Sequence, residues 1–460
     1  MKVCVISEGG YPVARGGLGE WAHSLISNLK QIDFAVFAIV GEGDKPVWKR
    51  LPNVSSMTVI PFTQARYQNA VIPAGKQSVN LSVFLREILK SKPMDFSSII
   101  SKKSMAPISK KWLLSRDYWR SIVAFYEETN HEGPFTEYFW TILGLHSSII
   151  DSLNAFFHLP RADVYHALSA GFAGFLGAMG KAVYGTPFML TEQGLYLRER
   201  ENELKRLKVS EWYRRQVLSF SESLVKTSYR YADAVVPPCH SHKYVGQQYG
   251  LDLNKVRVIN NGINCDHFIP GPGRNGSEPV VGCFARVVPV KDLEVLIHAA
   301  DIVCQNHKAR FIVAGETQDL QYFKDCQQLV TNLGLTDRFK FLGHMDSLKG
   351  LHDVDIFTLS SYSEGVPYAL LEAMGCGLPA VCTAVGGVPE IIRKDTGFLV
   401  PPKQPETLAS KICELIENKE LRARMGRRAR EVALTDYTVE VMGKNFLNLY
   451  KELSHERGQH

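Results

Sequence analysis

Two glutamates, Glu364 and Glu372, stand in a segment whose residue types suit the binding of a polar ligand. Glu364 follows the apolar run Ile356–Ser360, and Glu372 falls within the helix expected to open at Pro367, since proline costs little in a first helical turn. A helix that starts after a sheet strand presents free N–H groups and the positive end of its dipole, which together bind anions. Carboxylates beside such a site repel phosphate, so hydroxyl groups are their expected partners. The alternative is that Glu364 caps the helix and Glu372 lies on the surface.

Two cations precede these glutamates in the same half of the chain. Arg286 follows the apolar run Val280–Phe284, and Lys291 comes after a short loop that contains proline, at the start of the next expected helix. Cations at the carboxyl end of a parallel strand, beside a crevice, suit a pyrophosphate group. An Arg-x4-Lys pattern alone is weak, but together with the glutamate pair it indicates a site for a phosphorylated, hydroxyl-rich ligand.

A glycine-rich loop stands near the N-terminus, where Ser7-Glu8-Gly9-Gly10-Tyr11-Pro12 is followed by Arg15-Gly16-Gly17. Glycines let a backbone approach a ligand closely. The dinucleotide fingerprint Gly-x-Gly-x-x-Gly cannot be placed there, and no acidic ribose-binding residue follows at the expected distance. Both observations argue against a nicotinamide-dependent dehydrogenase.

The elements that must position these residues alternate regularly. Short β-branched runs separated by helix-length stretches predict βαβ units and parallel sheets covered by helices on both faces, an α/β fold. The expected strands are Val3–Ser7, Phe34–Val40, Val164–Ala167, Phe188–Thr191, Ala234–Pro237, Val256–Ile259, Val280–Phe284, Phe311–Ala314, Phe339–Leu342, Ile356–Ser360, Ala380–Thr383 and Phe398–Val400.

The 460 residues are too many for one ordinary core, so two domains are expected. A stretch rich in Pro, Gly and Ser, around residues 265–280, predicts a linker between an N-terminal domain (1–268) and a C-terminal domain (275–435). The first domain carries an insertion at about 80–160, mostly helical and rich in aromatic residues that include Trp112 and Trp119. Residues 436–460 have the apolar spacing of an amphipathic helix.

The composition is that of a globular protein, with 45% hydrophobic and 22% charged residues. No apolar run reaches the roughly 18–20 residues that span a membrane, and the first strand begins too early for an export signal. The nine cysteines are scattered and odd in number, which indicates reduced thiols rather than a disulfide framework. A cytoplasmic location is therefore predicted.

Positive charge is concentrated between Arg86 and Arg120. This window holds nine basic and three acidic residues, a difference that equals the formal net charge of the whole chain, +6. The basic residues are Arg86, Lys90, Lys92, Lys102, Lys103, Lys110, Lys111, Arg116 and Arg120. Such a surface attracts membrane phosphates, an anionic glycan or nucleic acid. The alternative is an ordinary solvated helical face.

Two further patterns resemble metal sites. Asp353-Val-Asp355 has the Asp-x-Asp form but precedes a buried strand, so a role at a helix end is preferred. Cys239-His240-Ser-His242 has no second Cys/His pair at zinc-finger spacing, and it is interpreted as the start of a helix. No metal ligand is predicted.

Taken together, these motifs resemble family 4 of the retaining glycosyltransferases, over nearly the whole chain. The pair Glu364-x7-Glu372 matches that family's two-glutamate signature, and Arg286 and Lys291 match its diphosphate-binding Arg and Lys. The N-terminal half looks closest to the PelF-like branch, which builds an exopolysaccharide from UDP-glucose. The stretches that carry this likeness are the loop from Glu8 to Trp21, Asp163–Gly174 and Leu190–Arg200.

The resemblance implies a GT-B fold, in which two Rossmann-like domains face across a cleft and the C-terminal helix crosses back to the first domain. It also implies transfer of a hexose from a nucleotide sugar to a glycan or lipid-linked acceptor with retention, and with neither metal nor other cofactor. Arg286, Lys291 and Glu364 are the expected catalytic residues. The expected donor-binding residues are Gly17, Arg286, Lys291, Gly343, Glu364, Gly365, Val366, Leu370 and Glu372. The expected acceptor-side residues are His166, Glu192, Gln193 and Arg198.

One position departs from the family pattern. Gln193 stands where the PelF-like branch carries a histidine that is expected near the transferred sugar, so this change bears on donor choice or activity. Competing interpretations are a sugar phosphorylase or sucrose-synthase-like enzyme on the same fold, and a non-catalytic nucleotide-sugar-binding subunit of a polysaccharide export assembly. Peripheral contact with a membrane or export complex through the basic insertion is expected, and nucleic acid is not an expected partner.

Overall fold

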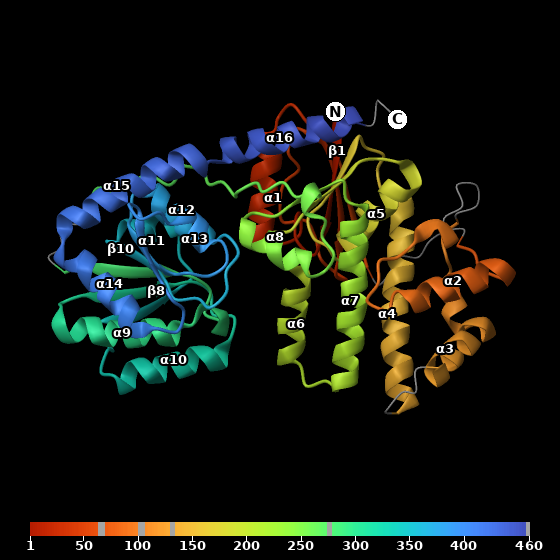
Figure 1. Cartoon of the computed structure of the whole chain (residues 1–460), viewed down its shortest axis with the longest axis horizontal. Coiled ribbons are helices and arrows are strands. Elements are labelled where there is room, and N and C mark those ends of the chain that lie inside the picture. The colour runs from red at the N-terminus through yellow and green to blue at the C-terminus, as the bar shows by residue number, and fades with distance from the viewer. Residues whose placement is uncertain (63–69, 100–105, 129–133, 274–277, 457–460) are drawn as a thin grey trace. The chain divides into compact units, whose positions relative to one another are not determined.

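The computed structural model describes residues 1–62, 70–99, 106–128, 134–273 and 278–456 (Figure 1). These residues form two compact units. Unit 1 comprises residues 1–237, 243–258 and 446 onward, and unit 2 comprises residues 238–242 and 259–445.

The core of unit 1 is a parallel sheet of six strands in the order β3-β2-β1-β4-β5-β6. Because β1 pairs with both β2 and β4, the chain builds the sheet outward in both directions from its first strand. The strands are β1 (Lys2–Glu8), β2 (Asp33–Val40), β3 (Val54–Pro61), β4 (Val164–Ala167), β5 (Phe188–Thr191) and β6 (Ala234–Val236). The central strands are buried on both faces, as continuous apolar runs predict.

Helices cover this sheet and extend beyond it. They are α1 (Gly17–Asn28), α2 (Gly75–Glu87), α3 (Arg116–Glu128), α4 (Phe135–Ala155), α5 (Phe172–Tyr184), α6 (Tyr196–Arg206), α7 (Glu211–Tyr231) and α8 (His240–Gln247). The region expected to be a helical insertion holds α2, α3, α4 and a short 3-10 turn, Lys110–Leu114. Within it Trp112 is fully buried and donates its indole N–H to Ser78 over 3.0 Å, whereas Trp119 is exposed.

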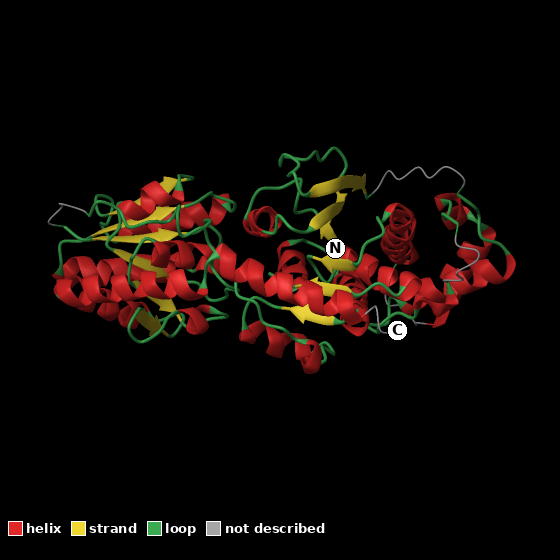
Figure 2. Ribbon diagram, turned by 90° about the horizontal axis from the view of Figure 1, so that it is seen from above, coloured by secondary structure: helices red, strands yellow, loops and turns green. Residues whose placement is uncertain are grey.

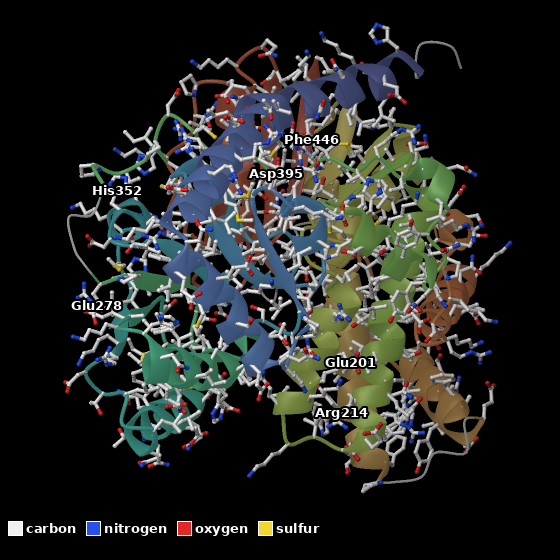
Figure 3. All side chains as sticks on the ribbon, turned by 60° about the vertical axis from the view of Figure 1, so that its left-hand side comes forward. Glu201, Arg214, Glu278, His352, Asp395 and Phe446 are labelled. Atoms are coloured by element: carbon white, nitrogen blue, oxygen red, sulfur yellow. The ribbon has the colours of Figure 1, made fainter. Side chains whose placement is uncertain are left out.

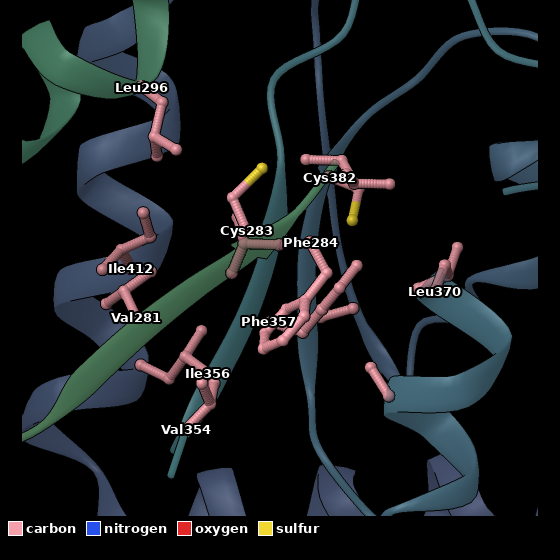
Figure 4. Packing of buried hydrophobic residues seen from close by; sticks show 14 of the residues in the cluster. Val281, Cys283, Phe284, Leu296, Val354, Ile356, Phe357, Leu370, Cys382 and Ile412 are labelled. Atoms are coloured by element: carbon pink, nitrogen blue, oxygen red, sulfur yellow. The ribbon is translucent and has the colours of Figure 1, made fainter. Parts of the chain in front are cut away.

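Unit 2 repeats the plan with the strand order β12-β11-β10-β7-β8-β9, again all parallel (Figure 2). The strands are β7 (Val280–Phe284), β8 (Arg310–Ala314), β9 (Phe339–Gly343), β10 (Ile356–Leu359), β11 (Ala380–Thr383) and β12 (Gly397–Val400). Apolar side chains from β7 and β10 pack between the sheet and its helices, and the rings of Phe284 and Phe357 stack with their centroids 6.5 Å apart (Figure 4).

The helices of unit 2 complete both faces of its sheet. They are α9 (Leu293–Asn306), α10 (Leu320–Asn332), α11 (Ser347–His352), α12 (Tyr368–Gly375), α13 (Val388–Ile391), α14 (Pro405–Glu417) and α15 (Lys419–Asp436). The last helix, α16 (Val439–Glu456), begins in unit 2, and its residues from Phe446 onward belong to unit 1.

Two strand predictions differ from the structure. The expected strand Val256–Ile259 is not formed, and Val256 makes only an isolated bridge to Val235. The strand β3 was not expected, because at the sheet edge its side chains after Val54 are half-buried or exposed and the sequence lacks a clear apolar run.

After a first short segment of unit 2 at residues 238–242, the chain passes into unit 2 again at Ile259, ahead of the expected linker. The physical reason is a pair of backbone hydrogen bonds that fix Ile263 to the far end of unit 2. Ile263 N–H donates to the Tyr437 carbonyl over 2.8 Å, and Val439 N–H donates to the Ile263 carbonyl over 3.1 Å.

Two expectations from composition concern thiols and membranes. All nine cysteines are free thiols, and most are buried. Among the described helices, none combines the length and the apolar character that crossing a bilayer requires.

Candidate functional site

In unit 2 the polar residues singled out in the sequence meet at one place on the sheet. The strands β7 and β10 are neighbours, and from them the chain continues in opposite directions, to β8 and β9 on one side and to β11 and β12 on the other. The crevice beyond the carboxyl ends of two such strands is where open α/β sheets bind ligands. The loop after β7 carries Arg286 and Lys291, and the loop after β10 carries Ser361 and Glu364.

Lys291 and Glu364 form an ion pair across this crevice. The distance from Lys291 Nζ to Glu364 Oε1 is 2.7 Å, and the two side chains are 15% and 9% exposed. The Ser361 hydroxyl donates to the same carboxylate oxygen. In a pair so sheltered from water, each charge depends on the other, and removing one partner leaves an uncompensated buried charge.

Hydrogen bonds to main-chain carbonyls hold these two loops together. The Ser360 hydroxyl donates to the Lys291 carbonyl over 2.9 Å, and Tyr362 N–H donates to the Val290 carbonyl over 3.1 Å. The Thr383 hydroxyl, at the end of β11, donates to the Ser361 carbonyl over 2.6 Å. The loops are therefore set by the backbone and by small hydroxyl side chains, which the sequence alone did not single out.

Arg286 lies exposed at the same edge of the sheet. Its Nη1 donates to Gln318 Oε1 over 2.8 Å, and no carboxylate among the described residues pairs with it. Behind it, a Cβ on Gly315 would lie 2.0 Å from the Ala285 carbonyl oxygen, so only glycine fits there. Arg286 thus presents a cation to solvent at the end of β7.

The start of α12 differs in detail from the expectation. Pro367 is the residue before the first helical position rather than part of the first turn, and no side chain caps this helix. Val366 and Leu370 were expected to bind the donor as part of the helix start, and their side chains are buried in the core. Leu370 N–H donates to the Pro367 carbonyl. Donor binding by the backbone at this helix start stays a prediction. Glu372 lies half-buried in the middle of α12.

A second pair of glycines supports Glu364 from the loop after β11. Gly386 has a φ of +56°, and a Cβ there would lie 1.8 Å from the Glu364 carbonyl oxygen. Gly387 N–H donates to the Gly365 carbonyl over 2.9 Å. The double glycine after an apolar strand was the available sequence signal, and sequence reasoning missed it.

The two other glycines of the expected donor set lie in open surroundings. Gly343 ends β9 with a φ of +69°, and Gly17 is the first residue of α1 in unit 1. A Cβ at either position meets nothing within 4 Å. That a ligand comes close to the backbone at these two glycines remains a prediction.

His166, the first of the expected acceptor-side residues, lies inside unit 1. Its ring is fully buried, with Nδ1 2.7 Å from the Tyr450 hydroxyl and Nε2 2.7 Å from the Thr191 hydroxyl. Burial lowers the pKa of His166 to about 3. Both ring nitrogens are used within the protein, and the acceptor-side role of His166 stays a prediction.

The other acceptor-side residues follow β5. Glu192 is buried and accepts a hydrogen bond from the Tyr229 hydroxyl over 2.5 Å, and burial raises its pKa to about 7. Gln193 is half-buried in the turn before α6, and Arg198 is exposed on α6. Of the four residues, Gln193 and Arg198 keep surface that a ligand can reach.

Glu8, at the end of β1, is a residue of unit 1 whose role the sequence did not assign. Its Oε2 accepts from Phe172 N–H, at the start of α5, over 2.8 Å and from the Ser169 hydroxyl over 3.3 Å. A Cβ on Gly171 would lie 2.4 Å from the Tyr196 ring and 2.6 Å from the same carboxylate. Burial raises the pKa of Glu8, and the Phe172 N–H opposes that rise. The only sequence feature that pointed to Glu8 was its position at the end of β1, directly before the glycines of the loop.

The patterns resembling metal sites have other roles. Asp353 stands at the C-terminal end of α11, and Asp355 accepts from Val280 N–H over 2.9 Å. The helix α8 begins at His240, where the Glu390 carboxylate accepts N–H groups of His240 and Ser241 over 2.8 and 3.0 Å. Within the described ranges, no cluster of three or more His, Cys, Asp or Glu side chains could hold a metal ion.

Two family models match the chain. Residues 1–253 match a family described as "Domain of unknown function (DUF3492)", and residues 266–432 match "Glycosyl transferases group 1". The N-acetyl-alpha-D-glucosaminyl L-malate synthase of Bacillus anthracis is 31% identical over 183 residues, which is 39% of this chain and 47% of that protein. The chain spans about half the length of the curated relatives it matches.

Solved structures match along almost the full chain. The sucrose-phosphate synthase of Thermosynechococcus elongatus covers 98% of both chains, with a TM-score of 0.65 and 18% identity. Anabaena Alr3699/HepE, solved in complex with UDP, covers 98% of this chain and 100% of that one, with a TM-score of 0.63 and 18% identity. These matches confirm the predicted GT-B fold class of two Rossmann-like units.

Proposed function

The chain belongs to the family described as "Domain of unknown function (DUF3492)" and carries a group 1 glycosyl transferase domain, and on this premise we propose that it transfers a hexose from a nucleotide-diphosphate sugar. The acceptor is a glycan or a lipid-linked glycan, in polysaccharide biosynthesis in the cytoplasm. UDP-glucose is the favoured donor. This choice is supported by the resemblance of the N-terminal half to PelF-like enzymes and by the UDP complex of the similarly folded Alr3699/HepE.

The observation that carries the proposal is the ion pair of Lys291 with Glu364, on the loop that also carries the exposed Arg286. A diphosphate entering the crevice offers Lys291 a stronger anionic partner and binds Arg286 as well. Glu364, released from the lysine, then accepts a hydrogen bond from a hydroxyl of the donor sugar. Ligand binding thus exchanges one ion pair for two productive contacts, and the position of the sugar becomes coupled to that of the diphosphate.

The proposed chemistry takes its retention of configuration from the family resemblance. The bond between the anomeric carbon and the diphosphate oxygen breaks, and the acceptor oxygen bonds to the same face of that carbon, so that configuration is retained. The leaving phosphate takes the acceptor's proton. Arg286 and Lys291 stabilise the negative charge that develops on the diphosphate, the kind of preorganised electrostatic stabilisation that is worth several kcal/mol in enzymes. Glu372 is proposed to hold the ribose hydroxyls.

The test is the release of UDP from UDP-glucose by the purified full chain, measured with EDTA present. Slow release without an acceptor, accelerated by an added glycan fraction, is the expected result. Calorimetric binding of UDP-glucose without release would instead favour the non-catalytic subunit, for which Gln193 in place of the family histidine is the supporting observation. Absence of both binding and release would overturn the proposed function.

A further inference from the structure

Several helices of unit 1 expose large apolar side chains. Val79 and Val83 on α2, Trp119 on α3, Trp140 on α4 and Leu207 after α6 are 61%, 47%, 49%, 67% and 53% exposed. Single exposed apolar residues are ordinary, whereas a contiguous group marks an interaction surface.

These side chains lie on elements that pack against one another. A groove of about 410 Å³ between α2 and α3 is lined by both valines and by Arg120. From Trp119 the surface continues across α4, because the ring centroids of Trp119 and Phe139 are 5.6 Å apart and those of Phe139 and Trp140 are 5.2 Å apart.

One exposed contact and one contact of the buried Tyr138 join α4 to the segment between α6 and α7. The Ser210 hydroxyl donates to the Glu137 carboxylate, one helical turn before Trp140. The rings of Tyr138 and Trp212 lie with their centroids 5.7 Å apart. Figure 3 labels Glu201 on α6 and Arg214 on α7, which flank this segment. We call the whole surface, from Val79 to Leu207, the insertion surface.

Positive charge accompanies the apolar side chains. Six exposed cations on or beside the insertion surface have no acidic partner within the described ranges: Lys111, Arg116, Arg120, Arg206, Lys208 and Arg215. Of the nearby acids, Glu211 pairs with Arg214, whereas Asp117 and Glu137 accept from serine hydroxyls and keep their charge, and Glu127 is exposed.

The structure also refines the basic window noted in the sequence. Arg86, Lys90 and Lys110 pair with Glu128, Glu87 and Asp151, so these cations are partly neutralised. Lys102 and Lys103 lie outside the described residues. The remaining cations of the window combine with Arg206, Lys208 and Arg215, which lie far along the sequence.

We propose that the insertion surface docks the protein onto the face of an anionic lipid bilayer. Tryptophan rings are suited to the headgroup level of a bilayer, because they are apolar with one polar N–H, and the cations interact with lipid phosphates. A protein partner is the less favoured occupant, because the surface joins two exposed tryptophans to cations on α3, α6 and α7 that have no acidic partner within the described ranges. The docked surface is separate from the residues of the candidate site, so docking does not rest on the proposed activity.

The experiment is flotation of the full chain with phosphatidylcholine vesicles, with and without phosphatidylglycerol, in the absence of donor. The wild-type protein is expected to float only with anionic vesicles and to be released as salt rises. Each Lys or Arg near the surface contributes about fivefold in partitioning, so Arg116→Gln with Arg120→Gln is expected to lower binding roughly 25-fold. Trp119→Ala with Trp140→Ala is expected to lower it on the order of tenfold or more.

Matched controls lie in unit 2. Arg424→Gln with Arg427→Gln makes the same charge change on exposed residues of α15, and Leu320→Ala removes an exposed apolar side chain from α10. These variants are expected to float as the wild type does. Thermal unfolding of all variants checks the fold, which substitutions at exposed positions leave intact. Equal loss in the controls, binding to neutral vesicles alone, or no binding to any vesicle would overturn the proposal, the last outcome directing the surface to a protein partner.

Discussion

Both units have a parallel sheet with polar residues near the carboxyl ends of its strands. The two sets of polar residues differ in how far they are paired within the protein. In unit 1 the polar groups near the carboxyl ends of β1, β4 and β5 are already satisfied by the protein, as Glu8 is by the start of α5, His166 by Tyr450 and Glu192 by Tyr229. In unit 2 the corresponding edge holds a cation with one exchangeable partner and a second cation facing solvent. We therefore expect unit 2 to bind an anion that replaces a carboxylate, whereas in unit 1 the half-buried Glu8 and the buried Glu192 are hydrogen-bonded within the protein.

The first way to break this comparison is to remove the exchangeable cation. Lys291→Ala is expected to cost about 2–4 kcal/mol of transition-state stabilisation, a 30- to 1000-fold loss in kcat/KM for the donor. Arg286→Ala, which leaves the Glu364 carboxylate paired, is expected to lose activity with less effect on stability. Steady-state UDP release and thermal unfolding measure the two effects. Wild-type turnover by both variants would show that the edge of unit 2 is not the phosphate site.

The two glutamates sharpen the comparison further, because only one of them faces the cations. Glu372→Gln is expected to weaken binding of both UDP and UDP-glucose by roughly 1.5–3 kcal/mol, the value of a lost charged hydrogen bond. Glu364→Gln is expected to keep UDP affinity and lose turnover, since the sugar is no longer held for attack. Calorimetry with UDP beside transfer rates separates them. Loss of UDP affinity in Glu364→Gln but not in Glu372→Gln would mean that the proposed placement of the donor is reversed or wrong.

The third prediction concerns the backbone behind Glu364. Gly386→Ala places a Cβ against the Glu364 carbonyl at a φ of +56°, so the loop must shift, at a cost of about 1–3 kcal/mol in the free energy of unfolding and with reduced transfer. Gly334→Ala is the matched control, because its φ of +68° carries the same strain while its Cβ meets open space. Denaturant unfolding and UDP release are measured on both. Equal effects would reduce Gly386 to an ordinary strained glycine.

The smallest effect on transfer is expected at Glu192 in unit 1. Its pKa is raised by burial to about 7, so the folded protein binds a proton there that the unfolded chain releases above about 4.5. Stability from this group is therefore present at low pH and is lost as pH rises from about 4.5 to about 7. Glu192→Gln keeps an acceptor for Tyr229 and is expected to flatten that part of the stability profile, with transfer at neutral pH nearly unchanged. A profile identical to the wild type would contradict the buried acid.

Much of the candidate site of unit 2 could be predicted from the sequence, because parallel strands end at one edge. Once Val280–Phe284 and Ile356–Ser360 were identified as strands, Arg286, Lys291 and Glu364 had to lie together. The sequence could not show that Leu370 is wholly a core residue, since a helix after such a loop has both buried and exposed faces.

In unit 1, the surroundings of single side chains could not be predicted from the sequence in this way. His166 stands after Val164-Tyr165 like a residue at a strand end, and its burial depends on Tyr450, which lies 284 positions away. Trp112 and Trp119 looked alike in the sequence, yet one is enclosed by α2 and its hydrogen bond to Ser78, while the other remains exposed. Such outcomes depend on distant segments and not on local spacing.

The helix α16 has a consequence for the order in which the two units fold. Phe446 and Tyr450 pack against Trp21, Phe34 and His166, so the first unit buries its aromatic residues with a segment from the other end of the chain. Domains generally fold as units in the order in which they leave the ribosome. Here the first unit to emerge is expected to keep that surface uncovered until residues 446–456 have been synthesised. Unit 2, whose residues run from 259 to 445 almost without interruption, is expected to reach its native fold first.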